Sequence, residues 1–135
     1  MLMHAAMIKA IAREQGVKAV NYYHTWFDLK PGVGDLEFSR AMTRFMVHLK
    51  EAGKIEGWKM TRRKLGFGPK ELGDFHVVME TRDLAQLDDA FSTIVTRDEP
   101  VESVHFAVNS KVQNLTIALY RDFPDPERRE GEEKF

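Results

Sequence analysis

The most informative absence in this 135-residue chain is cysteine, of which it has none. This excludes a disulfide framework, a thiolate metal site and a cysteine nucleophile, and it suits the cytoplasm, where we expect the protein to reside. No uncharged stretch reaches the roughly 20 apolar residues of a membrane span. Residues 1–15 carry Lys9 inside their apolar run and offer no cleavage pattern, so we expect no signal peptide and a soluble chain.

Net charge is also nearly absent. The 20 Lys and Arg residues almost cancel the 21 Asp and Glu residues, which leaves a net charge of −1. The chain therefore lacks the broad positive field that attracts nucleic acid or anionic lipid. The segment KLGFG is faintly similar to an RNA-recognition motif, but Gly66 and Phe67 stand before the next expected strand rather than within it. We expect neither a nucleic-acid nor a membrane partner.

Motifs for metals, cofactors and nucleophiles are missing as well. The chain has no GxxxxGK[ST], GxGxxG or GxSxG pattern. Its five histidines show none of the close spacings, such as HExxH, that place two ligands on one helix face. A single His48 or His105 could serve as a haem ligand, but a lone histidine is far more often a packing or surface residue. We therefore expect no metal and no bound cofactor.

What is present is the composition of one globular domain. Hydrophobic residues make up 43% of the chain and charged residues 30%, and the length suits a single hydrophobic core. We divide the chain into an N-terminal extension over residues 1–18, a domain over 19–124 and a charged tail over 125–135. Apolar residues at helical spacing make the extension either a short amphipathic helix or a loosely held segment.

Strand-like and helix-like patterns alternate along residues 19–124. Aromatic and β-branched residues predict strands over 19–29, 57–67, 74–81 and 115–123. Helical periodicity predicts a first helix capped by Asp35 and a second that begins at a capping box of Asp83 and Gln86. After Pro100 it predicts a short third helix that reaches Val112, with a strand as the lesser possibility. The glycines between residues 66 and 73 indicate a hairpin that joins the second and third strands.

This order predicts an α+β fold with a ferredoxin-like βαββαβ arrangement, an antiparallel four-stranded sheet and an extra short helix before the last strand. Helices should cover one sheet face. We expect the alternating apolar residues of the third and fourth strands to point toward these helices. They are Phe75, Val77 and Met79 on the third strand and Leu115, Ile117 and Leu119 on the fourth. On the other face, Tyr22, His24 and Trp26 would make a patch unusually large for a monomer. We expect a second copy of the chain to cover it.

Three segments carry a resemblance to a known group of proteins. They are NYYHTWFDLKPG, RRKLGFGPKELGDFHVVMETRDLAQLD and ALYRDFP, and the resemblance runs from about Asn21 to Pro124. The chain resembles an uncharacterised bacterial family in the dimeric α/β-barrel superfamily. This resemblance implies that two four-stranded sheets pair into a barrel with the helices outside. It also implies a small-molecule binder or a cofactor-independent enzyme, monooxygenase-like or isomerase-like, and it transfers no catalytic residue.

The sharpest functional hypothesis is a pocket on the sheet face opposite the helices. If the registers of the first and third strands match, Tyr22, His24 and Trp26 would lie on the same face as His76 and Glu80. A histidine beside a carboxylate can act as a general base, so His24 and His76 are the candidate catalytic residues. The candidate ligand-binding residues are Tyr22, Trp26, Arg62, Glu80 and Tyr120.

Each of these residues also has a plainer interpretation. Tyr and Trp are enriched at protein interfaces, so the aromatic set could simply form the contact of a non-catalytic regulatory or structural homodimer. Arg62, with Arg63 and Lys64, could bind a carboxylate or phosphate, but charges on an outer strand also discourage edge-to-edge pairing. The sequence favours the plainer interpretation in both cases.

Overall fold

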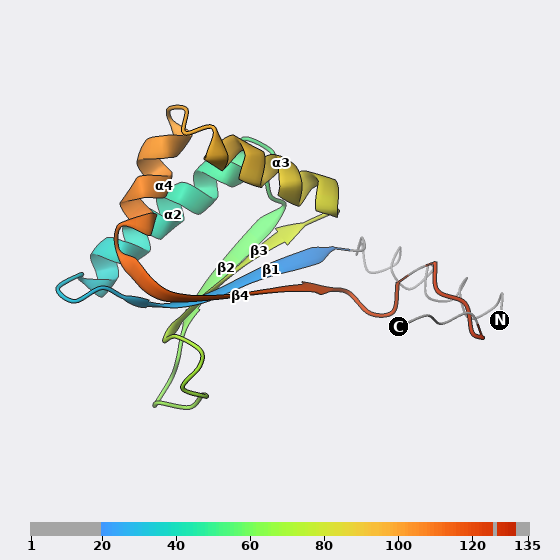
Figure 1. Ribbon diagram of the computed structural model, residues 1–135, viewed down its shortest axis with the longest axis horizontal. Coiled ribbons are helices and arrows are strands. Elements are labelled where there is room, and N and C mark those ends of the chain that lie inside the picture. The colour runs from blue at the N-terminus through green and yellow to red at the C-terminus, as the bar shows by residue number, and fades with distance from the viewer. Residues whose placement is uncertain (1–19, 126, 132–135) are drawn as a thin grey trace.

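The fold is a four-stranded antiparallel sheet with three helices on one face, seen in a computed structural model that describes residues 20–125 and 127–131 (Figure 1). Its elements are β1 (Asn21–Leu29), α2 (Asp35–Glu51), β2 (Gly57–Arg62), β3 (Phe75–Thr81), α3 (Leu84–Val95), α4 (Val101–Asn109) and β4 (Val112–Arg121). The strand order β2-β3-β1-β4 confirms the predicted ferredoxin-like α+β fold. The prediction for residues 1–18 and part of that for the tail lie outside the described residues.

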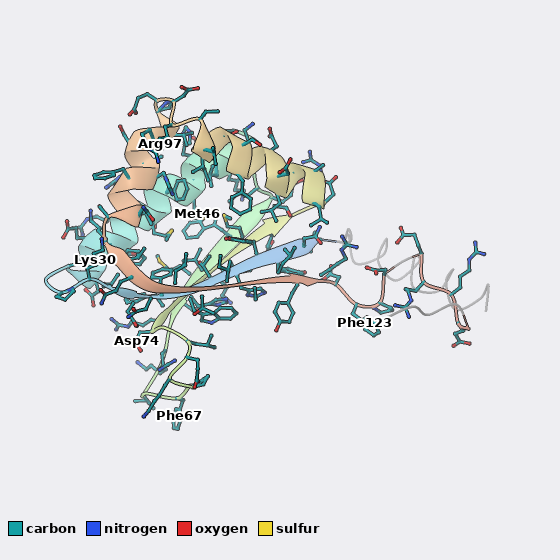
Figure 2. All side chains as sticks on the ribbon, viewed as in Figure 1. Lys30, Met46, Phe67, Asp74, Arg97 and Phe123 are labelled. Carbon is teal, nitrogen blue, oxygen red and sulfur yellow. The ribbon has the colours of Figure 1, made fainter. Side chains whose placement is uncertain are left out.

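The hydrophobic core lies between α2 and the sheet. One face of α2 is apolar at helical spacing, and its Phe38 and Leu49 are completely buried. Phe27 of β1 and Val77 of β3, each 2% exposed, meet them from the sheet. Figure 2 shows Met46 of α2 directed toward the sheet. Burial of these side chains is what holds the sheet against the helix layer.

Two predicted boundaries were wrong for physical reasons. Asp35 is the first residue of α2 and not its cap; Gly34 holds the cap position, because its carbonyl accepts the first helical hydrogen bond, from the Phe38 N–H at 3.0 Å, and the Asp35 carboxylate instead pairs with Arg62 at 2.9 Å. The second strand ends at Arg62 instead of residue 67. Leu65 and Gly66 adopt left-handed backbone conformations, with φ of 55° and 73°, which are incompatible with a strand.

The predicted cap of α3 is confirmed, because the Asp83 carboxylate accepts a hydrogen bond from the Gln86 backbone N–H at 2.8 Å; the Gln86 side chain in turn accepts from the Arg82 backbone N–H at 2.9 Å, one residue before the cap. The end of the chain differs from expectation. Val112, predicted to end the third helix, begins β4. The apolar set Leu115, Ile117 and Leu119 is 51–56% exposed, because β4 is an edge strand that lies largely beyond the helix layer.

In the part of the chain that the structure describes, no helix is long and apolar enough to cross a membrane.

Candidate functional site

The register of β1 and β3 brings most of the predicted site residues onto the sheet face opposite the helices. Tyr22 lies opposite Glu80, and Trp26 lies opposite His76. On the other side of β1, Tyr22 lies opposite Tyr120 of β4. We call this surface the histidine face; it comprises Tyr22, His24, Trp26, His76, Glu80 and Tyr120.

His24 and His76 form a direct hydrogen bond at the centre of the histidine face. His24 Nδ1 and His76 Nε2 are 2.9 Å apart, the ring planes differ by 9°, and the centroids are 5.1 Å apart. The nitrogen distance plus the two ring radii accounts for the centroid separation, so the rings lie edge to edge in nearly one plane. One ring donates an N–H and the other accepts. The pair can gain one proton on an outward nitrogen, but a second would set two N–H groups against each other.

Burial keeps this pair neutral. It lowers the pKa of His24, and it lowers the pKa of His76 with a further contribution from the charge of His24. Aromatic rings contribute to this burial, since Trp26 stacks on His76 at 4.8 Å between centroids and Tyr120 meets His24 edge-on at 5.1 Å. At neutral pH the pair is therefore an uncharged proton acceptor.

The predicted partnership between a histidine and a carboxylate does not form. Within residues 20–125 and 127–131, neither ring of the pair bonds a carboxylate. The Glu80 carboxylate instead lies over Gly57 of β2, where a Cβ would come within 2.8 Å of it. Arg62 lies on the opposite side of the sheet, paired with Asp35 and with its guanidinium 5.9 Å from the Phe75 ring centroid. Its guanidinium is therefore directed away from the histidine pair, although Arg62 is one of the residues that line the pocket at the hairpin end of this face.

Sequence reasoning overlooked Asp122, which follows β4. The Tyr22 hydroxyl donates a 2.7 Å hydrogen bond to its carboxylate. Burial, that bond and the nearby negative charges of Asp122 and Glu80 raise the pKa of Tyr22 to about 12. Tyr22 therefore stays protonated and ties the end of β4 to β1.

A small pocket opens at the hairpin end of the histidine face. It encloses about 240 Å³. Its floor is formed by Trp26, Thr61 and His76, and its wall by residues 63–74 of the β2–β3 loop, among them Phe67. Figure 2 shows Phe67 at the tip of this loop, which projects away from the helices. We call this space the hairpin-loop pocket.

A second cavity, of about 160 Å³, lies between the sheet and the helices. Its lining is mostly apolar, with Val108 of α4 at one wall and the methionines Met42, Met46 and Met79 around it. We call it the sheet–helix cavity. No sequence prediction included it, because its lining consists of residues that a periodic pattern assigns to the core.

Four polar residues line the sheet–helix cavity, and the hydroxyl of one of them, Thr25, already donates a 3.2 Å hydrogen bond to the Val77 carbonyl. The other three are Tyr23, His105 and Asn109, of which Asn109 is exposed; within the described residues their side chains make no hydrogen bond to another group. Burial lowers the pKa of His105 and raises that of Tyr23, so both side chains are neutral near pH 7. They are free to orient a ligand.

Among residues 20–125 and 127–131, no three His, Asp or Glu side chains are grouped closely enough to hold a metal ion.

Comparison with known proteins places the chain. Residues 20–135 match the model described as a family of unknown function, DUF6614. The chain belongs to this family. This confirms the resemblance to an uncharacterised family, although the match names no activity. No curated protein matches the chain.

Solved structures share the fold at low identity. At3g17210 from Arabidopsis thaliana matches with a TM-score of 0.60 and 7% identity over 78% of this chain and 97% of its own. SnoaB, a cofactor-independent oxygenase from Streptomyces nogalater, matches with a TM-score of 0.57 and 10% identity over 81% of this chain and 100% of its own. A dimeric ferredoxin-like protein of unknown function from Thermobifida fusca matches with a TM-score of 0.51 and 14% identity over 76% of this chain and 91% of its own. These likenesses establish the ferredoxin-like fold.

Proposed function

We propose that this chain is a homodimeric small-molecule-binding protein whose ligand is a small, mainly apolar ring compound held in the sheet–helix cavity. The observation that carries the proposal is the cavity itself, an apolar space bordered by the polar groups of Tyr23, His105 and Asn109, which have no partner in the described part of the chain. Apolar cavities with a few convergent polar groups are the usual form of ligand sites.

The size of the cavity limits the ligand. Its volume of about 160 Å³ is close to that of engineered apolar cavities of about 150 Å³, which bind benzene. One aromatic ring would therefore fill it. Because His105 and Tyr23 are neutral near pH 7, they would hydrogen-bond a hydroxyl or carbonyl on the ring and would not attract an anion.

A reaction on such a ligand is the second level of the proposal. SnoaB is a cofactor-independent oxygenase with this fold, so a cofactor-independent monooxygenase or isomerase reaction is the activity to assay first. His105 is the side chain at the cavity that can exchange a proton near neutral pH.

Methionine methyl groups provide a direct test of ligand binding. In NMR spectra of protein with ¹³C-labelled methionine methyl groups, toluene should shift the signals of Met42, Met46 and Met79, which line the cavity, and leave Met60 unchanged. The Val108→Phe variant should lose these shifts, because the new ring fills the space. The matched Val95→Phe variant, at a position 75% exposed on α3, should keep them. Equal shifts at Met60, or full binding by Val108→Phe, would refute the proposal.

The homodimer rests on separate observations. β4 is an edge strand of the described sheet, paired with β1 on one side, and it exposes apolar side chains on both faces, with Ile117 52% and Tyr120 62% exposed. An edge strand with exposed apolar side chains is a template for pairing with another chain, and large exposed apolar patches mark interaction sites. The neighbour from Thermobifida fusca is itself dimeric. We propose that a second copy covers β4 and the adjoining part of the histidine face.

Light scattering during size-exclusion chromatography tests this assembly. The wild-type chain should elute with twice its 15.6 kDa mass. Ile117→Lys should shift the mass toward the monomer, whereas the matched Val95→Lys on α3 should remain a dimer. A monomeric wild-type protein would overturn the assembly and leave the cavity proposal standing.

A further inference from the structure

We propose that the hairpin-loop pocket is a second ligand site, for a small planar molecule that carries an acidic hydroxyl, a phenol or an enol, whose proton His76 accepts. This site lies on the opposite side of the sheet from the sheet–helix cavity. It is independent of the ligand proposed above for the sheet–helix cavity.

The loop that forms the wall is held in place before any ligand binds. The Arg63 guanidinium donates hydrogen bonds to the carbonyls of Pro69 and Leu72, at 2.7 and 2.6 Å. At the base of the loop, the Asp74 N–H donates to the Asp28 carboxylate at 2.9 Å. A preformed wall lowers the entropy that a ligand must lose on binding.

The charges around the pocket select a neutral ligand. Two arginines line it, but Arg62 is paired with Asp35, and Arg63 is committed to the loop carbonyls and lies 3.7 Å from the Asp74 carboxylate. A carboxylate or phosphate would need one of these guanidinium groups to leave its partner. A phenol or enol needs only a hydrogen-bond acceptor and a flat surface. Trp26 on the floor provides the flat surface.

His76 supplies the acceptor. Its Nδ1 lies 3.4 Å from the Thr61 hydroxyl, a long contact that a ligand hydroxyl can replace. When Nδ1 takes the proton, the ligand O–H bond breaks, an N–H bond forms, and the electron pair stays on the ligand oxygen as a phenolate or enolate. The Nε2–H of His76 then donates to His24 Nδ1, already 2.9 Å away. His24 is thus a positioning residue that stabilises the imidazolium.

4-Nitrophenol is a suitable probe, because its anion absorbs visible light and it quenches nearby tryptophan fluorescence. In buffer just below the pH at which the free probe ionises, the assembled wild-type protein should increase the anion band and show saturable quenching. The two tryptophans separate the sites: Trp58→Phe should keep the quenching, since Trp58 packs on the helix side, and Trp26→Phe should lose it.

Histidine variants decide the outcome. His76→Gln should lose the anion band and bind at least tenfold more weakly, while the matched His48→Gln, on α2 and in the lining of neither cavity, should behave as wild type. Phe67→Ala should also weaken binding, and this variant keeps the fold because Phe67 is 80% exposed at the loop tip. The proposal is overturned by absence of saturable quenching, by wild-type behaviour of both His76→Gln and Phe67→Ala, or by loss of binding in His48→Gln.

Discussion

Gly73, at the end of the hairpin loop, is the position where the smallest substitution should have the largest effect. A Cβ added there would lie 2.3 Å from the backbone carbon and 2.4 Å from the carbonyl oxygen of Phe27. The obstacle is backbone and cannot rotate away, so Gly73→Ala must separate the loop from β1. Overpacking of this kind costs about 1–3 kcal/mol. Loss of the adjacent bond from the Asp74 N–H to Asp28 adds about 1 kcal/mol.

Alanine also restricts the unfolded chain, which offsets about 0.4–1 kcal/mol of that cost. We therefore expect Gly73→Ala to lower the unfolding free energy by about 2–3 kcal/mol, measured by urea denaturation at fixed protein concentration. The matched control is Gly34→Ala, where φ is −74° and the nearest atom, Cβ of Glu37, lies at 3.8 Å. That variant should lose at most about 1 kcal/mol, because alanine is only a poorer helix cap. Equal stability of the two variants would refute the steric reasoning.

Three further predictions concern the histidine face and the loop. Burial lowers the pKa of His24 and His76 from 6.5, so the unfolded chain binds protons at a higher pH than the folded chain does. The free energy of unfolding should therefore decrease as the pH falls below about 7, by up to about 1.4 kcal/mol per pH unit for each histidine. Urea titrations at several pH values should show a smaller decrease for the His24→Gln/His76→Gln variant than for wild type. Tyr22→Phe removes the bond to Asp122 and should lower the unfolding free energy by about 1–2 kcal/mol in the same assay; no change would show that the bond adds nothing. Arg63→Ala releases the loop carbonyls, so trypsin should cleave at the loop lysines faster than in wild type, and an unchanged rate would contradict a preformed wall.

Local patterns were sufficient to predict the elements and their order. The apolar spacing in α2 and the cap at Asp83 depend on neighbours within one or two helical turns, so the sequence contains them directly. The expected cap at Asp35 was wrong by one residue, because the Gly34 carbonyl accepts the first helical hydrogen bond; the Asp35 carboxylate pairs with Arg62, 27 residues further along the chain. A local rule cannot include a partner that only the fold brings near.

The sheet–helix cavity could not be predicted for a related reason. Tyr23 alternates with the residues of the histidine face, and His105 follows the helical period of α4, so both patterns assign them simply to the helix side of the sheet. An unfilled space depends on how side chains of β1, α2 and α4 fill the volume between them. That sum of volumes is a property of the packed structure, and no single segment encodes it.

The histidine pair lies between these cases. Alternation predicts that His24 shares a face with His76 and Glu80, and the register places it opposite Val78, diagonal to both. Sequence alone cannot choose between the two diagonals. Strand twist makes the diagonals unequal, and Gly57 of β2, opposite Glu80, leaves open space above its backbone that the carboxylate occupies. The carboxylate therefore leans toward β2 and away from β1. The ring of His24 meets the other diagonal neighbour, and the face acquires an imidazole pair in place of the expected acid and base.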